Sequence, residues 1–308
     1  FTGTTTTNGI NIDTSGRVLI GGTSSQTQYG SQSSLQVQGT GFNDSTIALR
    51  RDENNANPPG VIFAKSRAGS IGGNTIVQDD DQIGSLFFAA ADGNDLTTLA
   101  AEIRAEIDGS PNADDMPGRL IFRTTSDGTN SPTERLRITS TGRIGINIDN
   151  PDSYNSSGNN LVLGITNNNA GMTIVSSTTN NGHIFFADGT ASGAQNRGII
   201  KYEHGNDAMA FNTAESEAFR ADSSQRVLVG GNSARANFNN GTRTAYLQLE
   251  GTSGKNIDSS SLALIYNENS TGNASNIYFG KTRGGTVGDN SALNATGDRL
   301  GNISFQGN

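Results

Sequence analysis

Short apolar segments alternate with polar breaks along this chain, and one such pattern occurs three times. Its copies read NGINIDTSGRVLIGG at 8–22, ERLRITSTGRIGI at 134–146 and EAFRADSSQRVLVGG at 217–231. Each copy has an alternating segment, a polar break ending in Gly or Gln, an Arg, and a second apolar segment. Alternation bounded by turn residues predicts paired β-strands. Recurrence over a long chain predicts a repeat array, which usually provides length or surface rather than a reaction centre.

Further apolar triplets follow the three marker arginines, Arg17, Arg143 and Arg226, in the same order each time. They are 35–37, 47–49, 61–63 and 86–88; then 161–163, 172–174, 184–186 and 209–211; then 247–249, 262–264, 277–279 and 303–305. Residues i and i+2 share one face of a strand, so each triplet turns two apolar side chains to one side. We interpret them as core-facing strand residues. The alternative, for one or two of them, is an aromatic platform that binds a ligand.

The spacing of the markers divides the chain into repeat units. We expect residues 1–15 to be the end of a preceding unit, 16–141 a long unit with inserted strands, 142–224 a short unit, and 225–308 an incomplete unit of the long type. Within the long unit, 101–108 alternates Ala and Ile with charged residues, which predicts a strand rather than a helix. The abrupt start and end lead us to expect an internal piece of a longer fibrous protein.

The composition provides few apolar side chains that could form a hydrophobic core. Apolar residues make up 32% of the 308 residues, and 40 residues are Gly, which has no side chain to pack. Such a chain is either disordered or an ordered β-protein that completes its core with copies of itself. The regular triplets favour the second interpretation. Assembly with other copies would pair or cover the exposed strand edges and would complete the core. We therefore expect a parallel, intertwined homotrimeric β-fibre with these side chains facing inward: Phe63, Phe88, Phe122, Phe186, Phe211, Phe279 and Phe305.

Charge and residue usage exclude several classes of protein. The net charge is −8 and the basic residues do not cluster, so we expect no nucleic-acid partner. The chain has no Cys, which excludes disulfides and thiolate metal sites. Its longest apolar run, 86–91, is far shorter than the roughly 20 residues needed to cross a bilayer, so we expect no membrane insertion.

Candidate chemistry is sparse, and we expect neither enzymatic activity nor a cofactor or metal. His183 and His204 lack metal-ligand spacing. Glu102, Glu106 and Asp108 share one strand face with Arg104, which is either a carboxylate pair of a glycosidase or, as we favour, a solvated charged face balanced by Arg. The segment 92–95 (DGND) offers oxygen ligands for calcium, but a turn is the favoured interpretation. Two further acidic runs, 79–81 and 114–115, are expected to be loop charges.

One stretch carries a family resemblance. Residues 137–146, RITSTGRIGI, resemble the R-I-x-x-x-G-x-V-G-I-G repeats of bacteriophage tail-fibre and related virion appendage proteins, and 101–146 is similar to fibres of marine phages that infect cyanobacteria. Gln225 and Asn147 depart from the glycines of that pattern, although Asn accepts left-handed backbone. The resemblance implies a homotrimer on a virion, with other tail or baseplate proteins and a host-surface glycan or receptor as partners. Many such fibres end in a self-cleaving chaperone domain, which here would lie beyond Asn308.

The sequence thus predicts a structural segment of a phage tail fibre that projects and supports host-receptor attachment. Two other functions stay open at this point. One is a glycan-degrading tailspike, and the other is a bacterial surface adhesin.

Overall fold

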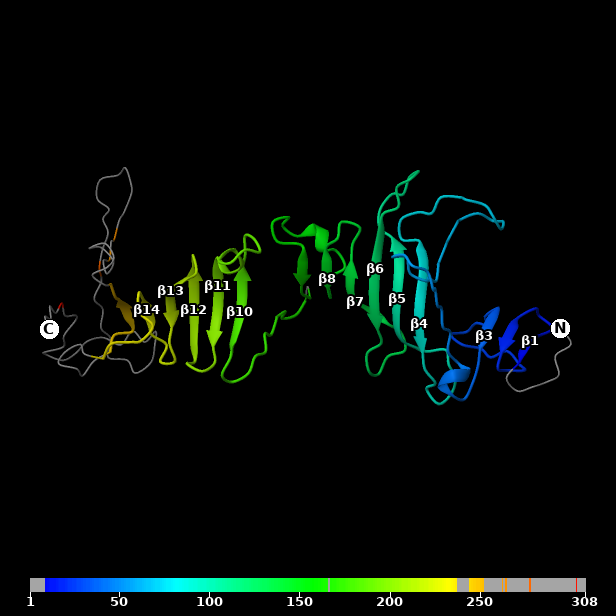
Figure 1. Ribbon diagram of the computed structural model, residues 1–308, viewed down its shortest axis with the longest axis horizontal. Coiled ribbons are helices and arrows are strands. Elements are labelled where there is room, and N and C mark those ends of the chain that lie inside the picture. Colours follow the sequence, from blue (N-terminus) through cyan, green and yellow to red (C-terminus); the bar gives the residue numbers. More distant parts are fainter. Residues whose placement is uncertain are drawn as a thin grey trace. The chain divides into compact units, whose positions relative to one another are not determined.

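The structure is a computed structural model that describes residues 9–165, 167–236 and 244–251, together with the single positions 262, 264, 277 and 303. The described residues form three β-sheets and contain no α-helix, which confirms an all-β fold (Figure 1). The chain divides into two compact units, Phe1–Met172 and Thr173–Asn308. Among the described residues, no helix is long and apolar enough to span a bilayer.

The first unit contains two sheets. The smaller has the order β1 (Ile10–Ile12), β2 (Val18–Ile20) and β3 (Leu35–Val37). The larger has six strands in chain order: β4 (Gln82–Ala89), β5 (Leu99–Ile107), β6 (Gly118–Thr124), β7 (Thr133–Ile138), β8 (Ile144–Ile146) and β9 (Leu161–Leu163). Two short 3-10 helices, η1 (Phe42–Asp44) and η2 (Pro151–Ser153), lie in the connections. The strand expected over 101–108 is confirmed as part of β5.

The second unit contains one sheet with the same plan. Its six strands also follow chain order: β10 (Asn181–Phe186), β11 (Gly198–Glu203), β12 (Ala208–Thr213), β13 (Ser216–Ala221), β14 (Val227–Val229) and β15 (Leu247–Leu249). The 3-10 helix η3 (Ala194–Asn196) lies between β10 and β11. All neighbouring strands in the three sheets are antiparallel except the last pair of each, which is parallel.

The marker motif forms a tight hairpin in all three copies. In the first, the Asp13 carboxylate accepts hydrogen bonds from the amides of Ser15 and Arg17, and the Arg17 side chain pairs with it at 2.7 Å. Asp222 repeats these contacts with Ser224 and Arg226. A short polar side chain that accepts backbone N–H groups fixes a turn, which explains why the motif recurs.

The residue before each marker Arg has left-handed backbone. Its φ is 78° at Gly16, 79° at Gly142 and 63° at Gln225. Four residues after each Arg the backbone is left-handed again, at Gly21, Asn147 and Gly230. Gln225 and Asn147, the two departures from the glycine pattern, therefore adopt the conformation that Gly supplies at the other copies.

The triplets 35–37, 161–163 and 247–249 form β3, β9 and β15, as expected. Three other triplets, 47–49, 61–63 and 172–174, are not in strands, so that expectation is wrong. Phe63 instead packs against β4, where a Cβ built on Gly84 would lie 2.5 Å from the Cβ of Phe63. The triplets at 262–264, 277–279 and 303–305 lie outside the residues described in full.

The position of each triplet in its sheet shows which triplets of the two units are equivalent, and this differs from the prediction. Leu86 and Phe88 lie in β4, the first strand of its sheet, and their counterparts in β10 are Ile184 and Phe186 rather than 209–211 as the spacing indicated. The order of strands in the sheets establishes this correspondence. Spacing along the sequence cannot, because it does not reveal that the segments 47–49 and 61–63 lack sheet partners. The predicted unit boundaries at 141/142 and 224/225 fall in hairpin turns, and as repeat boundaries they stay a prediction.

Candidate functional site

One face of each six-stranded sheet carries a continuous apolar row. In the larger sheet of the first unit, cross-strand pairing aligns one apolar residue from each strand in a row: Leu86, Ile103, Phe122, Leu136, Ile146 and Leu163. The second unit's sheet has the matching line Ile184, Ile200, Phe211, Phe219, Val229 and Leu249. We call this side of each sheet its apolar face.

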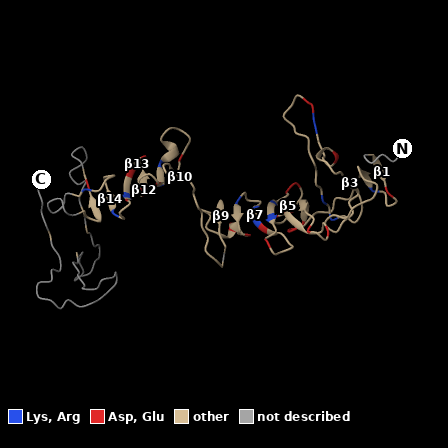
Figure 2. Cartoon of the chain, turned by 90° about the horizontal axis from the view of Figure 1, so that it is seen from below, with Lys and Arg blue, Asp and Glu red and all other residues tan. Residues whose placement is uncertain are grey.

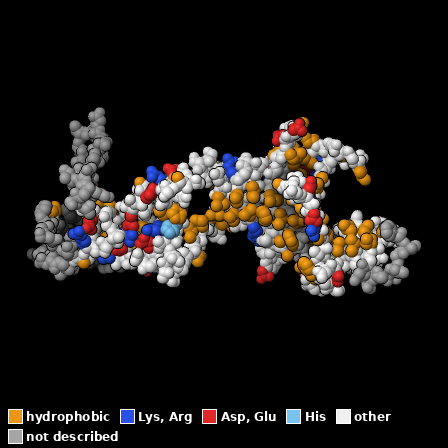
Figure 3. Space-filling view, viewed as in Figure 1, with side chains coloured by type: hydrophobic (Ala, Val, Ile, Leu, Met, Phe, Trp, Pro, Cys, Tyr) orange, Lys and Arg blue, Asp and Glu red, His pale blue; other side chains and the backbone are white. Residues whose placement is uncertain are grey.

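Large parts of the apolar faces are open to solvent in the single chain. The exposed fraction is 49% for Leu86, 49% for Phe88 and 57% for Phe186. Figure 3 shows hydrophobic side chains gathered over the sheet β4–β9. Most of the residues predicted to face inward belong to these faces, namely Phe63, Phe88, Phe122, Phe186 and Phe211. The other two, Phe279 and Phe305, lie outside the described residues. Within one chain they are therefore not a closed core.

The opposite face of β4–β9 is charged yet buried. Glu102 is 1% exposed, and its carboxylate accepts two hydrogen bonds from Arg104, both at 2.7 Å, and one each from Arg123 and Ser85. Glu106 bridges Arg104 and Arg119 at 2.9 and 2.6 Å. Figure 2 shows these charges along β5 and its neighbours. The expectation of one shared face is confirmed, but the expectation that it is solvated is wrong, because Glu102 and Glu106 are buried within their ion pairs.

These contacts set the protonation of the buried groups. Burial raises the pKa of Glu102, but the hydrogen bonds from Arg104, Ser85 and Arg123 outweigh it and hold the pKa below its ordinary value. Asp108 behaves in the same way, with burial outweighed by the amide of Ser140 and by Arg119. A glycosidase pairs one protonated carboxylic acid with one ionised carboxylate. The lowered pKa of Glu102 keeps this carboxylate ionised and bound to Arg104 and Arg123.

The other sequence candidates serve local structure. In the segment 92–95, the Asp92 carboxylate accepts the amides of Asn94 and Asp95, which makes the expected turn. Within the described residues, no group of three acidic or His side chains has the arrangement of a metal site. His183 stacks on Phe185 with ring centroids 5.0 Å apart, and His204 meets Tyr202 edge-on at 4.9 Å.

The acidic run 79–81 does more than carry loop charge. Asp81 accepts two hydrogen bonds from Arg67, which hold its pKa well below the ordinary value. Asp79 accepts the amide of Gly109 at 2.7 Å, and Asp80 pairs with Arg119. The run thereby joins the start of β4 to the end of β5. The second run, Asp114 and Asp115, lies in the β5–β6 connection, where Asp115 and Asn112 exchange two backbone hydrogen bonds.

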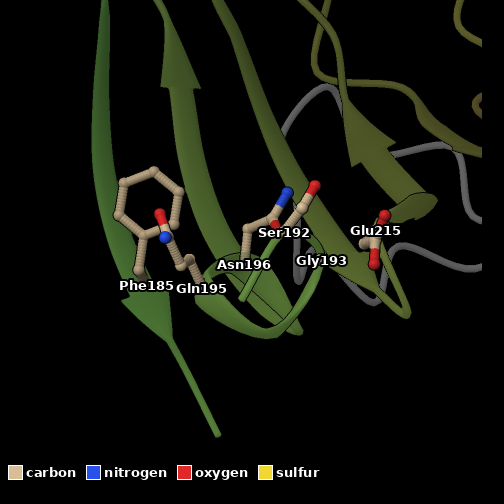
Figure 4. Close-up of a pocket in the computed structure, with 6 residues that line it drawn as sticks. All are labelled: Phe185, Ser192, Gly193, Gln195, Asn196 and Glu215. Carbon is tan, nitrogen blue, oxygen red and sulfur yellow. The ribbon is translucent and has the colours of Figure 1, made fainter. Parts of the chain in front are cut away.

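A pocket missed by the sequence reasoning lies on the second unit's sheet (Figure 4). Its volume is about 510 Å³, and its walls come from β10, the β10–β11 loop and the β12–β13 turn. The lining residues are Phe185, Ser192, Gly193, Gln195, Asn196 and Glu215. Only the paired aromatics of the segment 185–186 signal it in the sequence, and alternation places Phe185 on the face opposite Phe186.

Two features define the shape of this pocket. Ala214 and Glu215, at the tip of the β12–β13 turn, have φ values of 47° and 67°, where Asn and Gly are the usual residues. Gly193 also has positive φ, and a Cβ built on it would lie 2.3 Å from Oε1 of Glu215. The Glu215 carboxylate therefore occupies space that only a glycine at 193 leaves free.

No family model matches the chain, and no curated protein sequence matches it. Several solved structures resemble it, and two are named here. The carboxy-terminal domain of the bacteriophage T5 L-shaped tail fibre has 10% sequence identity and a TM-score of 0.32, over 74% of this chain and 100% of that one. The same domain with its intramolecular chaperone domain has 11% identity and a TM-score of 0.34, over 75% of this chain and 69% of that one. At these values the similarity carries no functional argument.

Proposed function

We propose that this chain is a structural segment of a phage tail fibre, located on the virion, that assembles as a homotrimer and supports attachment to a host receptor. The single observation that carries this proposal is the apolar row that crosses six strands and recurs in the second six-stranded sheet. Monomeric proteins rarely leave contiguous apolar surfaces uncovered, and larger ones mark interaction sites.

The partner that fits these faces best is a second and third copy of the same chain. The two rows have the same plan and contain no charged side chain, so like faces from identical copies can meet without burying an unpaired charge. Cyclic assembly of identical chains is the usual closed arrangement. Three equivalent sheets around an axis would turn their apolar faces inward, and the charged network on the opposite face is already satisfied by its own ion pairs.

A fibre segment also accounts for the thin core of the single chain. The buried apolar side chains are few and scattered among the strands, and they include Leu19, Leu99, Ile107, Ile121, Ala210 and Leu228. Attachment to other tail or baseplate proteins and projection toward a host receptor are part of the proposal. The adhesin and tailspike alternatives stay open.

Absolute mass in solution, measured by light scattering, tests the assembly. We expect three times the 32.1 kDa of one chain, together with resistance to unfolding in detergent. A folded monomer would overturn the proposal, and a dimer would overturn the threefold arrangement. Incubation with host polysaccharide, followed by a reducing-sugar assay, separates the fibre from the tailspike, because only the tailspike releases sugar.

Charge placed on the apolar face tests which surface is covered. Phe186→Asp and Leu86→Asp should each abolish the trimer, because a carboxylate would be buried at the contact without a partner. Ile71→Asp is the matched control, since Ile71 lies in a loop and is fully exposed. A trimer that persists in Phe186→Asp, or that is lost equally in Ile71→Asp, would contradict assembly through the apolar faces.

A further inference from the structure

Two segments of the chain have the sequence of a strand but no strand partner. Residues 61–66 (VIFAKS) and 173–176 (TIVS) are rich in residues that favour strands, yet neither segment belongs to a sheet. No backbone hydrogen bond joins either segment to another described residue. Ile62 and Val175 are 89% and 87% exposed. Both segments therefore have unused backbone donors and acceptors, which water satisfies in the single chain.

Each segment lies against the apolar face at a glycine. Gly84 on β4 and Gly182 on β10 belong to these faces, because each is two residues before a member of the apolar row. A Cβ built on Gly84 would lie 2.5 Å from the Cβ of Phe63, and one built on Gly182 would lie 3.5 Å from Cγ2 of Ile174. The two units thus repeat one arrangement, in which the segment before the first strand covers a glycine of the apolar face.

Assembly through the apolar faces would remove water from these segments. A buried backbone N–H or C=O group without a hydrogen-bond partner is destabilising. The segments 61–66 and 173–176 lie on the surface that the proposed assembly covers. Their backbone groups consequently need partners that the single chain does not supply, and a neighbouring copy is the source of those partners.

The first strand of each six-stranded sheet offers a matching edge. Among the described strands, β4 pairs only with β5, and β10 pairs only with β11. The outer edge of such a strand presents a row of N–H and C=O groups that readily pairs with another chain. The contact between Phe63 and Gly84 places the segment 61–66 over the face of its own β4 rather than beside the edge. The edge is therefore available to a different copy.

We infer that residues 61–66 of one copy add as a strand to the outer edge of β4 in a second copy, and that residues 173–176 add in the same way to β10. Strand addition of this kind joins chains through backbone hydrogen bonds. The donor segment and the acceptor edge are different surfaces, so the contact is heterologous, and a closed ring of copies uses every donor and every edge. The inference rests on the proposed function, because it identifies backbone contacts of that homotrimer.

Amide hydrogen exchange of the assembled protein, measured by mass spectrometry, tests the donor segment. We expect the amides of 61–66 to exchange at least about tenfold more slowly than those of the exposed polar loop 52–57. Ala64→Pro and Lys65→Pro each remove one amide, and neighbouring strand residues direct their amides to opposite sides. At least one of the two variants should return the segment to the exchange rate of the loop. Ala64→Ser is the matched control, because it keeps the amide and should keep the slow exchange.

Engineered disulfides test the acceptor edge, since the chain has no Cys of its own. Ile62→Cys is combined in turn with Ser85→Cys, Leu86→Cys and Phe87→Cys, which sample both faces of β4. We expect at least one combination to link separate copies on a non-reducing gel, because paired strands bring Cβ atoms within disulfide range. Ile71→Cys replaces Ile62→Cys in the control, because Ile71 lies in an exposed loop, and it should give no link between copies.

Light scattering on the same samples separates this inference from the proposed function. A trimer in which 61–66 exchanges at the rate of the loop, or in which disulfides form only within one chain, would overturn the strand addition and leave the trimer in place. A folded monomer would overturn the proposed homotrimer, and the strand addition with it.

Discussion

Glu102 and Arg104 are two residues apart on β5, on the same face, and are joined by two parallel hydrogen bonds of 2.7 Å. Their side chains are 1% and 15% exposed, so this pair is inside the molecule. Arg104 on the same strand and Arg123 on β6 both bind this buried carboxylate, so the charge pairing depends on strand register. The pair therefore contributes to the structure of the sheet.

Removal of that carboxylate should destabilise the fold. We expect Glu102→Gln to lower the free energy of unfolding by about 1.5–3 kcal/mol, the contribution of charged hydrogen bonds in a buried setting. Chemical denaturation at fixed protein concentration measures it. Glu53→Gln is the control, because Glu53 forms an exposed pair with Arg51 and its loss should cost less than about 1 kcal/mol. Equal losses in the two variants would contradict a buried network.

Stability should depend on pH through the same residue. The pKa of Glu102 lies below its ordinary value of 4.5 in the folded chain, so its stabilisation is complete above that value and is lost as the pH falls through the folded-state pKa. We expect the melting temperature to fall on acidification below pH 4.5, and less steeply in Glu102→Gln. A melting temperature that rises on acidification, or an identical slope in the variant, would contradict this linkage.

Two glycines in the first hairpin should differ in their tolerance of alanine. Gly16 and Gly21 have nearly the same φ, 78° and 81°, but a Cβ on Gly16 meets open space, whereas one on Gly21 would lie 2.0 Å from the carbonyl oxygen of Gln38. Gly16→Ala should cost about 1–2 kcal/mol from backbone strain alone. Gly21→Ala should cost roughly 1–3 kcal/mol more, because the backbone at Gln38, directly after β3, must move. Denaturation of the two variants side by side decides whether the steric contact matters.

The third hairpin should gain stability from a glycine. Gln225 has a φ of 63°, an exposed side chain, and glycine at the corresponding positions 16 and 142. Gln225→Gly should raise the free energy of unfolding by about 0.5–1 kcal/mol, since relief of strain exceeds the added chain entropy. The neighbouring Ser224→Gly should lower it. A loss of stability in Gln225→Gly would mean that its side chain makes a contact that offsets the strain.

Much of the local structure could be predicted from the pattern of residues. The three hairpins, the strands at 35–37, 161–163 and 247–249, and the strand over 101–108 follow from alternation and turn residues. The segments 47–49 and 61–63 have the same pattern but no sheet partner, and alternation cannot reveal whether a partner strand exists. The Phe185 pocket was missed because its walls come from two loops brought together only by the sheet.

The sequence by itself determined the period of the strands, the positions of the turns and the one-sided placement of large apolar residues, because these depend on neighbours along the chain. Only the tertiary structure decided which face is buried. Cross-strand register places Arg123 opposite Glu102 and Arg119 opposite Glu106, and these pairings turn a charged strand into the buried side of the sheet. Register depends on bulges and on connections between distant segments, which the local pattern does not encode. The apolar face, with Phe186 on its first strand, is left exposed in the single chain.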